Sequence, residues 1–333
     1  MATEGARTAA FSRNPELEAL LDQLSAAIGP GGDRLAARHR APRHPLILVV
    51  GCPRSGSTLA MQWLAASGCL AVPSNLISRF YRAPAIGALV QRLLFDPALD
   101  FRGELAVEAP GPGFDSALGK TRGALSPNEF WYFWRRFFRF GRDARLDDDA
   151  LSEVDGARLV SELAALESVL AKPLAMKALL MDWHLPLLAS LLEGALFLRV
   201  TRHPAHTIQS LLSARRAFTG AEDGWYSLRP PGWERITHRP PVEQVAWQVH
   251  QIRAAVEAGL QAVEPDRQQV LAYEDLCADP TAAWERLVLA LDRLGCSLDP
   301  TYRGPRSFTS ANRLDPARAE AIHAAWRAVE DGP

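Results

Sequence analysis

A short apolar run, followed at once by a loop with two glycines and then by a helix, constrains this chain more than any other feature. The run covers residues 46–50 (LILVV), and its lack of polar side chains predicts a buried strand. The loop covers residues 51–58 (GCPRSGST), and a helical pattern continues over 59–67. Backbone N–H groups and a helix N-terminus converge in such a loop, so it suits a phosphate group.

The loop lacks one residue that nucleoside-triphosphate enzymes use. Its length fits the pattern G-x-x-x-x-G-[K]-[ST], but Ser57 stands where that pattern has the lysine for the β- and γ-phosphates. Arg54 supplies a cation inside the loop instead. We therefore expect a site for a terminal phosphate or phosphosulfate without the usual Mg-triphosphate apparatus. An ordinary turn with Ser and Thr as helix caps is the alternative.

The rest of the chain alternates strands with helices, which predicts an α/β fold with a mostly parallel sheet. A first helix is expected to begin at Pro15 and to end at the glycine-rich residues 29–32, with residues 1–13 disordered and 33–45 a basic linker. The other expected helices cover 84–95, 127–140, 152–171, 185–193, 204–217, 240–263, 280–294 and 316–330, and the other strands cover 174–178, 195–200 and 269–273.

Composition and charge exclude several classes of protein. Hydrophobic residues make up 48% and charged residues 23%, which is ordinary for a globular protein. The 37 basic and 38 acidic residues nearly cancel, which excludes a bulk polycation that binds nucleic acid by charge alone. The four cysteines form no C-x-x-C pair, and no apolar stretch reaches about 18 residues. We expect no metal, no membrane span and a cytoplasmic location.

A second motif, far along the chain, places an arginine and a serine at a fixed spacing. Residues 200–210 (VTRHPAHTIQS) predict a strand that ends near Arg202 and a helix that begins at Pro204, with Ser210 about two turns in. Arg202 can form a bidentate pair with a phosphate, and Ser210 can add one hydroxyl bond. A surface ion pair is the plain alternative for an arginine at a strand end.

In this order, these stretches resemble the sulfotransferases that use 3′-phosphoadenosine 5′-phosphosulfate (PAPS). The 5′-phosphosulfate loop of that family looks like PRSGST at 53–58, and its 3′-phosphate motif has the spacing of Arg202 and Ser210. Three further stretches resemble segments of the same family. Residues 177–188 match its K…H-L-x-x-L pattern, residues 272–280 match its YEDL and DP pattern, and residues 303–313 stand in the place of its C-terminal nucleotide-binding loop. The resemblance covers about 46–313 and is nearest to bacterial and Golgi-type carbohydrate or tyrosyl enzymes.

The resemblance implies a fold, an activity and a donor site. The implied fold is a three-layer α/β/α, P-loop-like sulfotransferase domain that covers residues 46–314 and contains helical insertions. A helix and a basic linker at 1–45 precede this domain, and a C-terminal helix at 315–333 follows it. The implied activity is transfer of a sulfuryl group from PAPS, without a metal, to a hydroxyl acceptor, preferably a carbohydrate or glycolipid. The implied donor-binding residues are Arg54, Ser55, Gly56, Ser57, Thr58, Arg202, Ser210, Arg306, Ser307 and Arg313.

The resemblance leaves the general base open between two residues. His184 is the first candidate, because it matches the position near the family's catalytic histidine and its ordinary pKa suits neutral pH. Glu129 is the second, because aromatic neighbours would desolvate its carboxylate and raise its pKa. Asp182 and Glu108 come next. Tyrosyl-type relatives carry a glutamate soon after the loop helix, whereas residues 72–76 here contain no acid.

Two further catalytic roles follow from the same resemblance. Lys177 matches the lysine that holds the sulfuryl group, and Arg54 with Thr58 would stabilise the departing phosphate. The aromatic stretch at 130–140 is either core or one wall of an acceptor pocket, and the tryptophans of the loop at 218–239 could form a lid. A nucleotide kinase or NTPase and a non-catalytic nucleotide-binding module remain as alternative functions.

Overall fold

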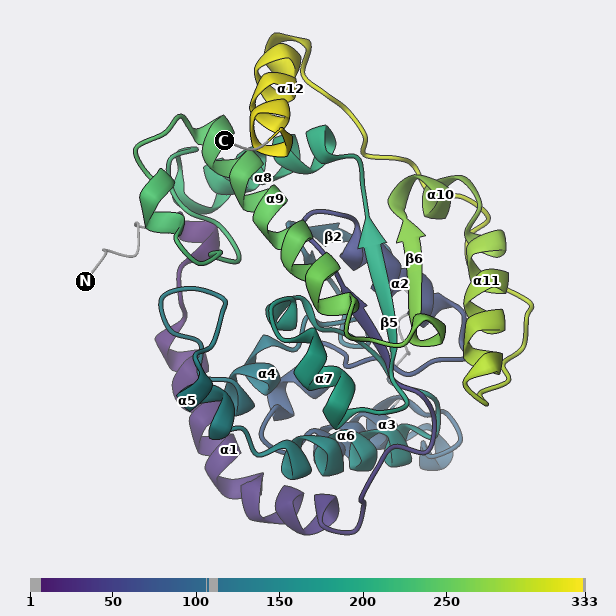
Figure 1. Ribbon diagram of the computed structural model, residues 1–333. Coiled ribbons are helices and arrows are strands. Elements are labelled where there is room, and N and C mark those ends of the chain that lie inside the picture. Colours follow the sequence, from purple (N-terminus) through teal and green to yellow (C-terminus); the bar gives the residue numbers. More distant parts are fainter. Residues whose placement is uncertain (1–6, 106, 108–112, 332–333) are drawn as a thin grey trace.

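A four-stranded parallel sheet forms the centre of the molecule. The computed structural model describes residues 7–105, 107 and 113–331. The strands are β1 (Ile47–Val50), β4 (Ala175–Lys177), β5 (Leu196–Thr201) and β6 (Gln268–Ala272), in the spatial order β4-β1-β5-β6. All three pairings are parallel, so every strand ends at the same edge of the sheet. Figure 1 shows helices on both faces of this sheet.

Alternate residues of the strands build two separate apolar layers. Leu48 and Val50 face a cluster that includes α7 (Leu185–Leu191), α8 (Pro204–Thr219) and α9 (Pro241–Leu260). Ile47 and Val49 face a cluster formed with α2 (Ser57–Ala66) and α11 (Pro280–Arg293). Because side chains of a strand alternate between faces, a fully apolar strand can bury both. The result is the expected three-layer α/β/α arrangement.

The remaining elements surround this core. They are α1 (Pro15–Ala36), α3 (Pro84–Phe95), α4 (Trp131–Phe137), α5 (Asp148–Ser152), α6 (Gly156–Leu170), α10 (Tyr273–Ala278) and α12 (Pro316–Glu330), the hairpin strands β2 (Ser116–Ala117) and β3 (Lys120–Thr121), and the 3₁₀ turns η1 (Ala9–Phe11), η2 (Ile77–Phe80), η3 (Phe101–Gly103), η4 (Leu179–Met181), η5 (Trp233–Ile236) and η6 (Pro265–Arg267). The last helix, α12, packs on α8 and α9 (Figure 1). Among the described residues, no helix is long and apolar enough to cross a membrane.

The first helix runs past the point where the sequence predicts its end. Helix α1 contains Pro30 and continues to Ala36. Tertiary contacts account for the extra turns, because the Asp33 carboxylate accepts hydrogen bonds from Arg82 at 3.0 and 3.1 Å and from Arg158 at 2.6 Å. Gly32 lets the helix approach α3, since a Cβ there would lie 2.5 Å from the Ala83 Cβ. The expected stop at 29–32 is therefore wrong.

The N-terminal segment is ordered where the sequence predicts disorder. The Thr8 backbone N–H donates to the Phe218 carbonyl at 2.9 Å, and the Thr8 hydroxyl donates to the Ala217 carbonyl at 2.8 Å. The Phe11 ring meets the Phe218 ring edge-on at 5.3 Å between centroids. These contacts attach residues 7–13 to the C-terminal end of α8, while residues 1–6 lie outside the described part of the chain.

Two of the expected helices are shorter than predicted. The helix expected at 127–140 is α4, over Trp131–Phe137, because Phe130 has a φ of 55° and so cannot continue a right-handed helix. The helix expected at 152–171 divides into α5 and α6, because the Asp155 side chain caps a new helix by accepting from the Arg158 N–H at 3.0 Å. Hydrophobic periodicity reports neither a positive backbone φ nor a capping side chain, so the sequence pattern alone did not predict these two helix boundaries.

Candidate active site

The loop at 51–58 joins β1 to α2 at the carboxyl edge of the sheet. Arg54 has a φ of 68° and Gly56 a φ of 98°, so the chain turns sharply twice. A side chain at Gly56 would collide with the Tyr273 ring, which packs directly against the loop. The Ser55 hydroxyl is buried and has no hydrogen-bond partner among the described residues. A buried polar atom that lacks a partner fits a loop that binds an oxyanion.

The two sequence motifs meet at this loop. Arg54 donates from Nε to the Ser210 hydroxyl at 3.1 Å, and Arg202 donates from Nη1 to the Arg54 carbonyl at 3.1 Å. The pKa of Arg202 is lowered, first by burial and also by the positive charge of Arg54. Two guanidinium groups that repel each other at a half-buried position create a site for an anion.

The segment at 303–313 reaches the site through residues that the sequence does not single out. Arg202 donates from Nε to the Asn312 side-chain oxygen at 2.7 Å and from Nη2 to the Ala311 carbonyl at 2.8 Å. The Ala311 N–H donates in turn to the Tyr273 hydroxyl at 2.8 Å, and the Arg202 guanidinium stacks over the Tyr273 ring. The expected ligands Arg306, Ser307 and Arg313 are exposed, and none of the three lines the cavity beside the loop.

Lys177 connects the loop to the carboxylate of Glu129. Its Nζ donates to the Thr58 hydroxyl at 2.8 Å and to the Glu129 carboxylate at 2.8 Å. Lys177 comes from the end of β4 and is 4% exposed, so a buried ammonium group joins two residues that line the cavity, Thr58 and Glu129. The structure thus brings two of the expected catalytic residues into direct contact.

Two asparagines hold the segment that carries Glu129. Asn128 donates from Nδ2 to the Asn75 side-chain oxygen at 2.7 Å and accepts from the Phe130 N–H at 2.8 Å. The Asn128 N–H donates to the Pro73 carbonyl at 2.7 Å. The 72–76 stretch, which contains no acid of its own, therefore anchors the segment that brings Glu129 to the site. The residue types of Asn75 and Asn128 alone do not indicate that these two side chains contact each other.

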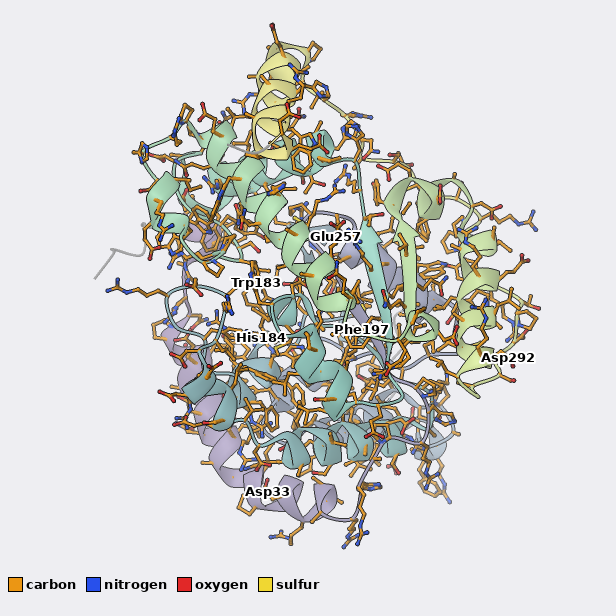
Figure 2. All side chains as sticks on the ribbon, viewed as in Figure 1. Asp33, Trp183, His184, Phe197, Glu257 and Asp292 are labelled. Carbon is orange, nitrogen blue, oxygen red and sulfur yellow. The ribbon has the colours of Figure 1, made fainter. Side chains whose placement is uncertain are left out.

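His184 lies away from the groups that Lys177 joins. It lies at the start of α7 (Figure 2). The side chain is buried, its Nε2 accepts from the Leu146 N–H at 3.0 Å, and it does not line the cavity. Burial lowers its pKa, although a hydrogen bond to the backbone of Ala144 acts in the opposite direction. The ring therefore bonds to the 144–146 segment and does not face the cavity.

Asp182 lies beneath the loop. It is fully buried, and one carboxylate oxygen accepts from the Gly51 N–H at 3.2 Å while the other has no partner among the described residues. Burial raises its pKa well above the ordinary value. Asp182 therefore supports the loop from inside and does not contact the cavity. Glu108, the other acid considered as a base, lies outside the described residues.

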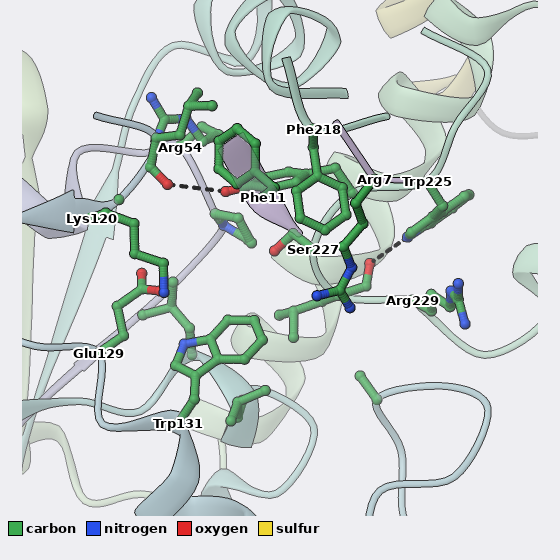
Figure 3. Close-up of a pocket in the computed structure, with 18 of the residues that line it drawn as sticks. Arg7, Phe11, Arg54, Lys120, Glu129, Trp131, Phe218, Trp225, Ser227 and Arg229 are labelled. Atoms are coloured by element: carbon green, nitrogen blue, oxygen red, sulfur yellow. Dashed lines mark hydrogen bonds between the residues drawn. The ribbon is translucent and has the colours of Figure 1, made fainter. Parts of the chain in front are cut away.

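A large cavity opens from the loop and from Glu129. Its volume is about 1400 Å³, and residues of the loop, α1, the β2–β3 hairpin, α4 and the 218–239 segment line it (Figure 3). The aromatic stretch divides between two roles. Its core members are Phe130, Phe133, Trp134, Phe137 and Phe138. Trp131, Tyr132 and Phe140 line the cavity, together with Trp225, Tyr226 and Trp233 of the long loop.

The chain belongs to the sulfotransferase family. The family's sequence profile matches residues 45–299, which includes the loop, Lys177 and the Arg202 motif. No curated protein sequence matches the chain. Within the described residues, no group of three or more histidine, cysteine, aspartate or glutamate side chains could hold a metal ion.

Solved sulfotransferases have a similar fold. Sulfotransferase STF1 from Mycobacterium tuberculosis H37Rv is 15% identical, with 92% of this chain and 79% of that chain covered and a TM-score of 0.52. Sulfotransferase STF9 from Mycobacterium avium is also 15% identical, with 91% and 81% covered and a TM-score of 0.48. At this identity the likeness to STF1 shows the fold alone.

Proposed function

We propose that the protein transfers a sulfuryl group from PAPS to a hydroxyl acceptor held in the cavity beside the loop. One observation carries this proposal, namely that Lys177 bridges the loop residue Thr58 and the carboxylate Glu129 at 2.8 Å each. Transfer of a charged group between two oxygens needs a cation at the reacting group and a base for the acceptor proton, side by side. Lys177 and Glu129 provide that combination.

The donor site of this proposal consists of the loop and the Arg202 motif. The loop backbone, Arg54 and Thr58 would hold the 5′-phosphosulfate, and Ser55, with its unpartnered hydroxyl, fits the same role. Arg202 and Ser210 would hold the 3′-phosphate, whose negative charge would relieve the repulsion between Arg54 and Arg202. The donor supplies the sulfuryl group, and its phosphate end remains on the loop.

In the proposed transfer, three side chains of this protein take part in the reaction. Glu129 takes the proton of the acceptor hydroxyl, which frees the oxygen to form its new bond to sulfur. Lys177 and Arg54 stabilise the negative charge that grows on the departing phosphate oxygen as its bond to sulfur breaks. We assign the base to Glu129 and not to His184, because the Glu129 carboxylate contacts Lys177 whereas His184 bonds to the 144–146 backbone.

We further propose a carbohydrate or glycolipid as the acceptor. The cavity presents Trp131, Tyr132 and Trp225, and flat aromatic faces stack well on sugar rings and on apolar chains. Its volume of about 1400 Å³ leaves room for more than a single small ring beyond the loop.

Binding of 3′-phosphoadenosine 5′-phosphate (PAP), the desulfated product, tests the proposal directly. Isothermal titration with PAP, ATP and Mg-ATP should show tight binding of PAP alone, and Arg54→Ala should weaken PAP about tenfold or more by removing a charge-assisted bond. Arg286→Ala, which removes an exposed arginine from α11, serves as the control and should leave PAP binding unchanged. Preference for Mg-ATP would point to a kinase or NTPase, and PAP binding without turnover of PAPS would point to a non-catalytic module.

A further inference from the structure

The tip of the β2–β3 hairpin lies against the two residues that Lys177 bridges. A Cβ at Gly119 would stand 3.2 Å from the Glu129 Oε1 atom and 3.8 Å from the Thr58 hydroxyl oxygen. Oε1 is also the atom that accepts from Lys177, whereas Oε2 of the same carboxylate has no hydrogen bond to any described residue. Lys177 and the hairpin tip therefore occupy one oxygen of Glu129, and the other oxygen stays available to a substrate.

The tip has a conformation that its own residues do not favour. Leu118 has a φ of 49° and Gly119 a φ of 88°. Two successive positive φ values are typical of a two-residue hairpin turn, in which asparagine or aspartate followed by glycine is preferred. Glycine adopts such values freely, but leucine does so only at a cost in free energy. We therefore expect a contact from outside the hairpin to stabilise Leu118.

Tyr226 provides such a contact from the 218–239 loop. Its hydroxyl donates to the Leu118 carbonyl at 3.1 Å. Burial raises the pKa of this hydroxyl, the positive charge of Arg54 lowers it, and the negative charge of Glu129 raises it. The phenol is thus bonded to the hairpin tip and lies within electrostatic reach of the proposed base.

Buried groups hold Tyr226 in place. Gln248 donates from Nε2 to the Tyr226 carbonyl at 3.0 Å, and its Oε1 accepts from Arg215 at 3.2 Å. Gln248 and Arg215 are both fully buried. The Phe218 ring also meets the Tyr226 ring edge-on, with 5.4 Å between the centroids. The hydroxyl therefore belongs to a well-anchored residue and can determine where the hairpin tip lies.

The opposite end of the hairpin has a separate anchor. Asn75 donates from Nδ2 to the Thr121 carbonyl at 3.2 Å and to the Thr121 hydroxyl at 3.0 Å. The Thr121 hydroxyl donates in turn to the Pro127 carbonyl at 2.7 Å. Loss of the Tyr226 hydroxyl would thus release the tip but leave the rest of the hairpin attached.

We propose that Tyr226 is a positioning residue for the base, because its bond to the Leu118 carbonyl keeps the hairpin tip against Glu129 and so keeps Oε2 turned toward the acceptor. This inference rests on the proposed function, since it takes Glu129 as the group that accepts the proton of the attacking hydroxyl. Tyr226 itself transfers no proton, and its effect reaches the reaction only through the hairpin tip.

Hydrogen exchange tests the contact without any assumption about the acceptor. Tyr226→Phe removes only the hydroxyl, so the amides of residues 116–121 should exchange about threefold to tenfold faster, the range that loss of one neutral hydrogen bond sets. Tyr302→Phe removes a buried hydroxyl that does not line the cavity, so this matched control should exchange like the wild type. The full-length proteins are compared with and without saturating PAP.

Turnover of labelled PAPS tests the route through Glu129. Sulfate released to water and sulfate transferred to 4-nitrophenyl β-D-glucoside are both measured. In either reaction the attacking oxygen bonds to sulfur, the bond from sulfur to the phosphate oxygen breaks, and Glu129 takes the proton. Tyr226→Phe should lower kcat about threefold to tenfold at unchanged PAP affinity. In a Glu129→Gln background it should change kcat less than twofold, because residues that act through one group are not additive.

A substitution at the tip provides a rescue. Leu118→Asn places a residue that tolerates positive φ at this position, so the hairpin tip depends less on Tyr226. The loss of kcat caused by Tyr226→Phe should therefore be smaller in the Leu118→Asn background than in the wild-type background. A role of Tyr226 confined to the stability of the 218–239 loop would not respond to Leu118 in this way.

Three results would overturn the inference. They are unchanged exchange of residues 116–121 in Tyr226→Phe, an equal loss of kcat with and without the Glu129 carboxylate, and a loss that Leu118→Asn does not reduce. PAP binding would persist in each case, so the proposed function would stand. Absence of PAP binding or of PAPS turnover in the wild type would contradict the proposed function instead, and hydrogen exchange would still decide whether Tyr226 holds the tip.

Discussion

Burial makes the contact between Lys177 and Glu129 more than an ordinary surface ion pair. A lysine that is 4% exposed needs a compensating charge, and its Nζ donates to Thr58 and to the Glu129 carboxylate. In the proposed reaction the same ammonium group faces the donor on one side and the base on the other. In that reaction its position would couple donor binding to activation of the acceptor hydroxyl.

The clearest prediction at this scale concerns Glu129. Glu129→Gln keeps the shape of the side chain but cannot take a proton, so kcat should fall by about 10²–10⁴-fold. PAP affinity should stay near the wild-type value, because Glu129 does not touch the 51–58 loop backbone. The measurement is steady-state turnover of labelled PAPS, paired with titration of PAP. Retention of most turnover in Glu129→Gln would remove Glu129 as the base.

The raised pKa of Asp182 predicts how the free energy of unfolding depends on pH. Burial holds its pKa well above the ordinary value of about 3.9, so the folded protein binds this proton more tightly than the unfolded chain does. The resulting stabilisation is complete below the unfolded pKa and is lost as pH rises toward the folded pKa. Asp182→Asn stays neutral, so its stability relative to the wild type should increase between pH 5 and pH 8.

Urea unfolding of both proteins at several pH values measures this difference. An Asp182→Asn curve that runs parallel to the wild-type curve at every pH would contradict the raised pKa. PAP affinity, measured alongside, shows whether the loop above Asp182 keeps its shape.

At the scale of elements, the site depends on the segment before α4, which carries Glu129 and lies far from the 51–58 loop in the sequence. Only residues 67–71 separate the 72–76 stretch from α2, yet this stretch anchors the segment before α4 through the bond between Asn75 and Asn128. Phe130 has a φ of 55° and is buried, so the turn after Glu129 is held in a conformation that an isolated peptide would avoid. Packing of the aromatic core supplies the free energy for that turn.

His184 gives the prediction that belongs to this scale. His184→Ala leaves the buried Leu146 N–H without its acceptor, so the free energy of unfolding should fall by about 1–3 kcal/mol. The kcat of the folded variant should stay within a few-fold of the wild type. Chemical denaturation and turnover of the same preparation measure both quantities. A large loss of kcat with unchanged stability would return His184 to the role of base.

Across the whole molecule, the chain uses its first residues to complete a site built mainly by later ones. Arg7 and Phe11 line the cavity and contact Phe218, more than 200 positions later, with Thr8 bonded to the backbone there. At the other end of the chain, the 311–312 segment holds Arg202, and α12 packs on α8 and α9. Segments near both ends therefore meet around the same central sheet.

Removal of the first segment gives the prediction for the whole molecule. Deletion of residues 1–13 removes Phe11 from the cavity wall, so KM for an aryl glycoside acceptor should rise about threefold to tenfold, the range of an aromatic contact. PAP affinity should not change, because the proposed donor-binding residues, in the loop and at Arg202, lie outside the deleted segment. Deletion of residues 1–6, which keeps Arg7 and Phe11, is the matched control. Equal KM values for the two deletions would show that Phe11 plays no part in acceptor binding.

Much of the fold can be predicted from the sequence, for identifiable physical reasons. The strand at 46–50 carries no polar residue, so it must be buried on both faces, and the loop after it has the spacing that places a helix N-terminus at a phosphate. Helix α3 and helix α12 begin at the expected prolines, Pro84 and Pro316, because proline preorganises the first turn. Local chemistry decides features of this kind.

Only the tertiary structure decided which of the candidate residues share a site. Lys177 and Glu129 are 48 positions apart, and nothing in their local sequence shows that β4 and the turn before α4 meet at Thr58. His184 has the residue type of a base, yet packing turned it toward the 144–146 backbone. Sequence patterns record backbone preference and burial, whereas a site depends on long-range contacts whose geometry exists only once the core has packed.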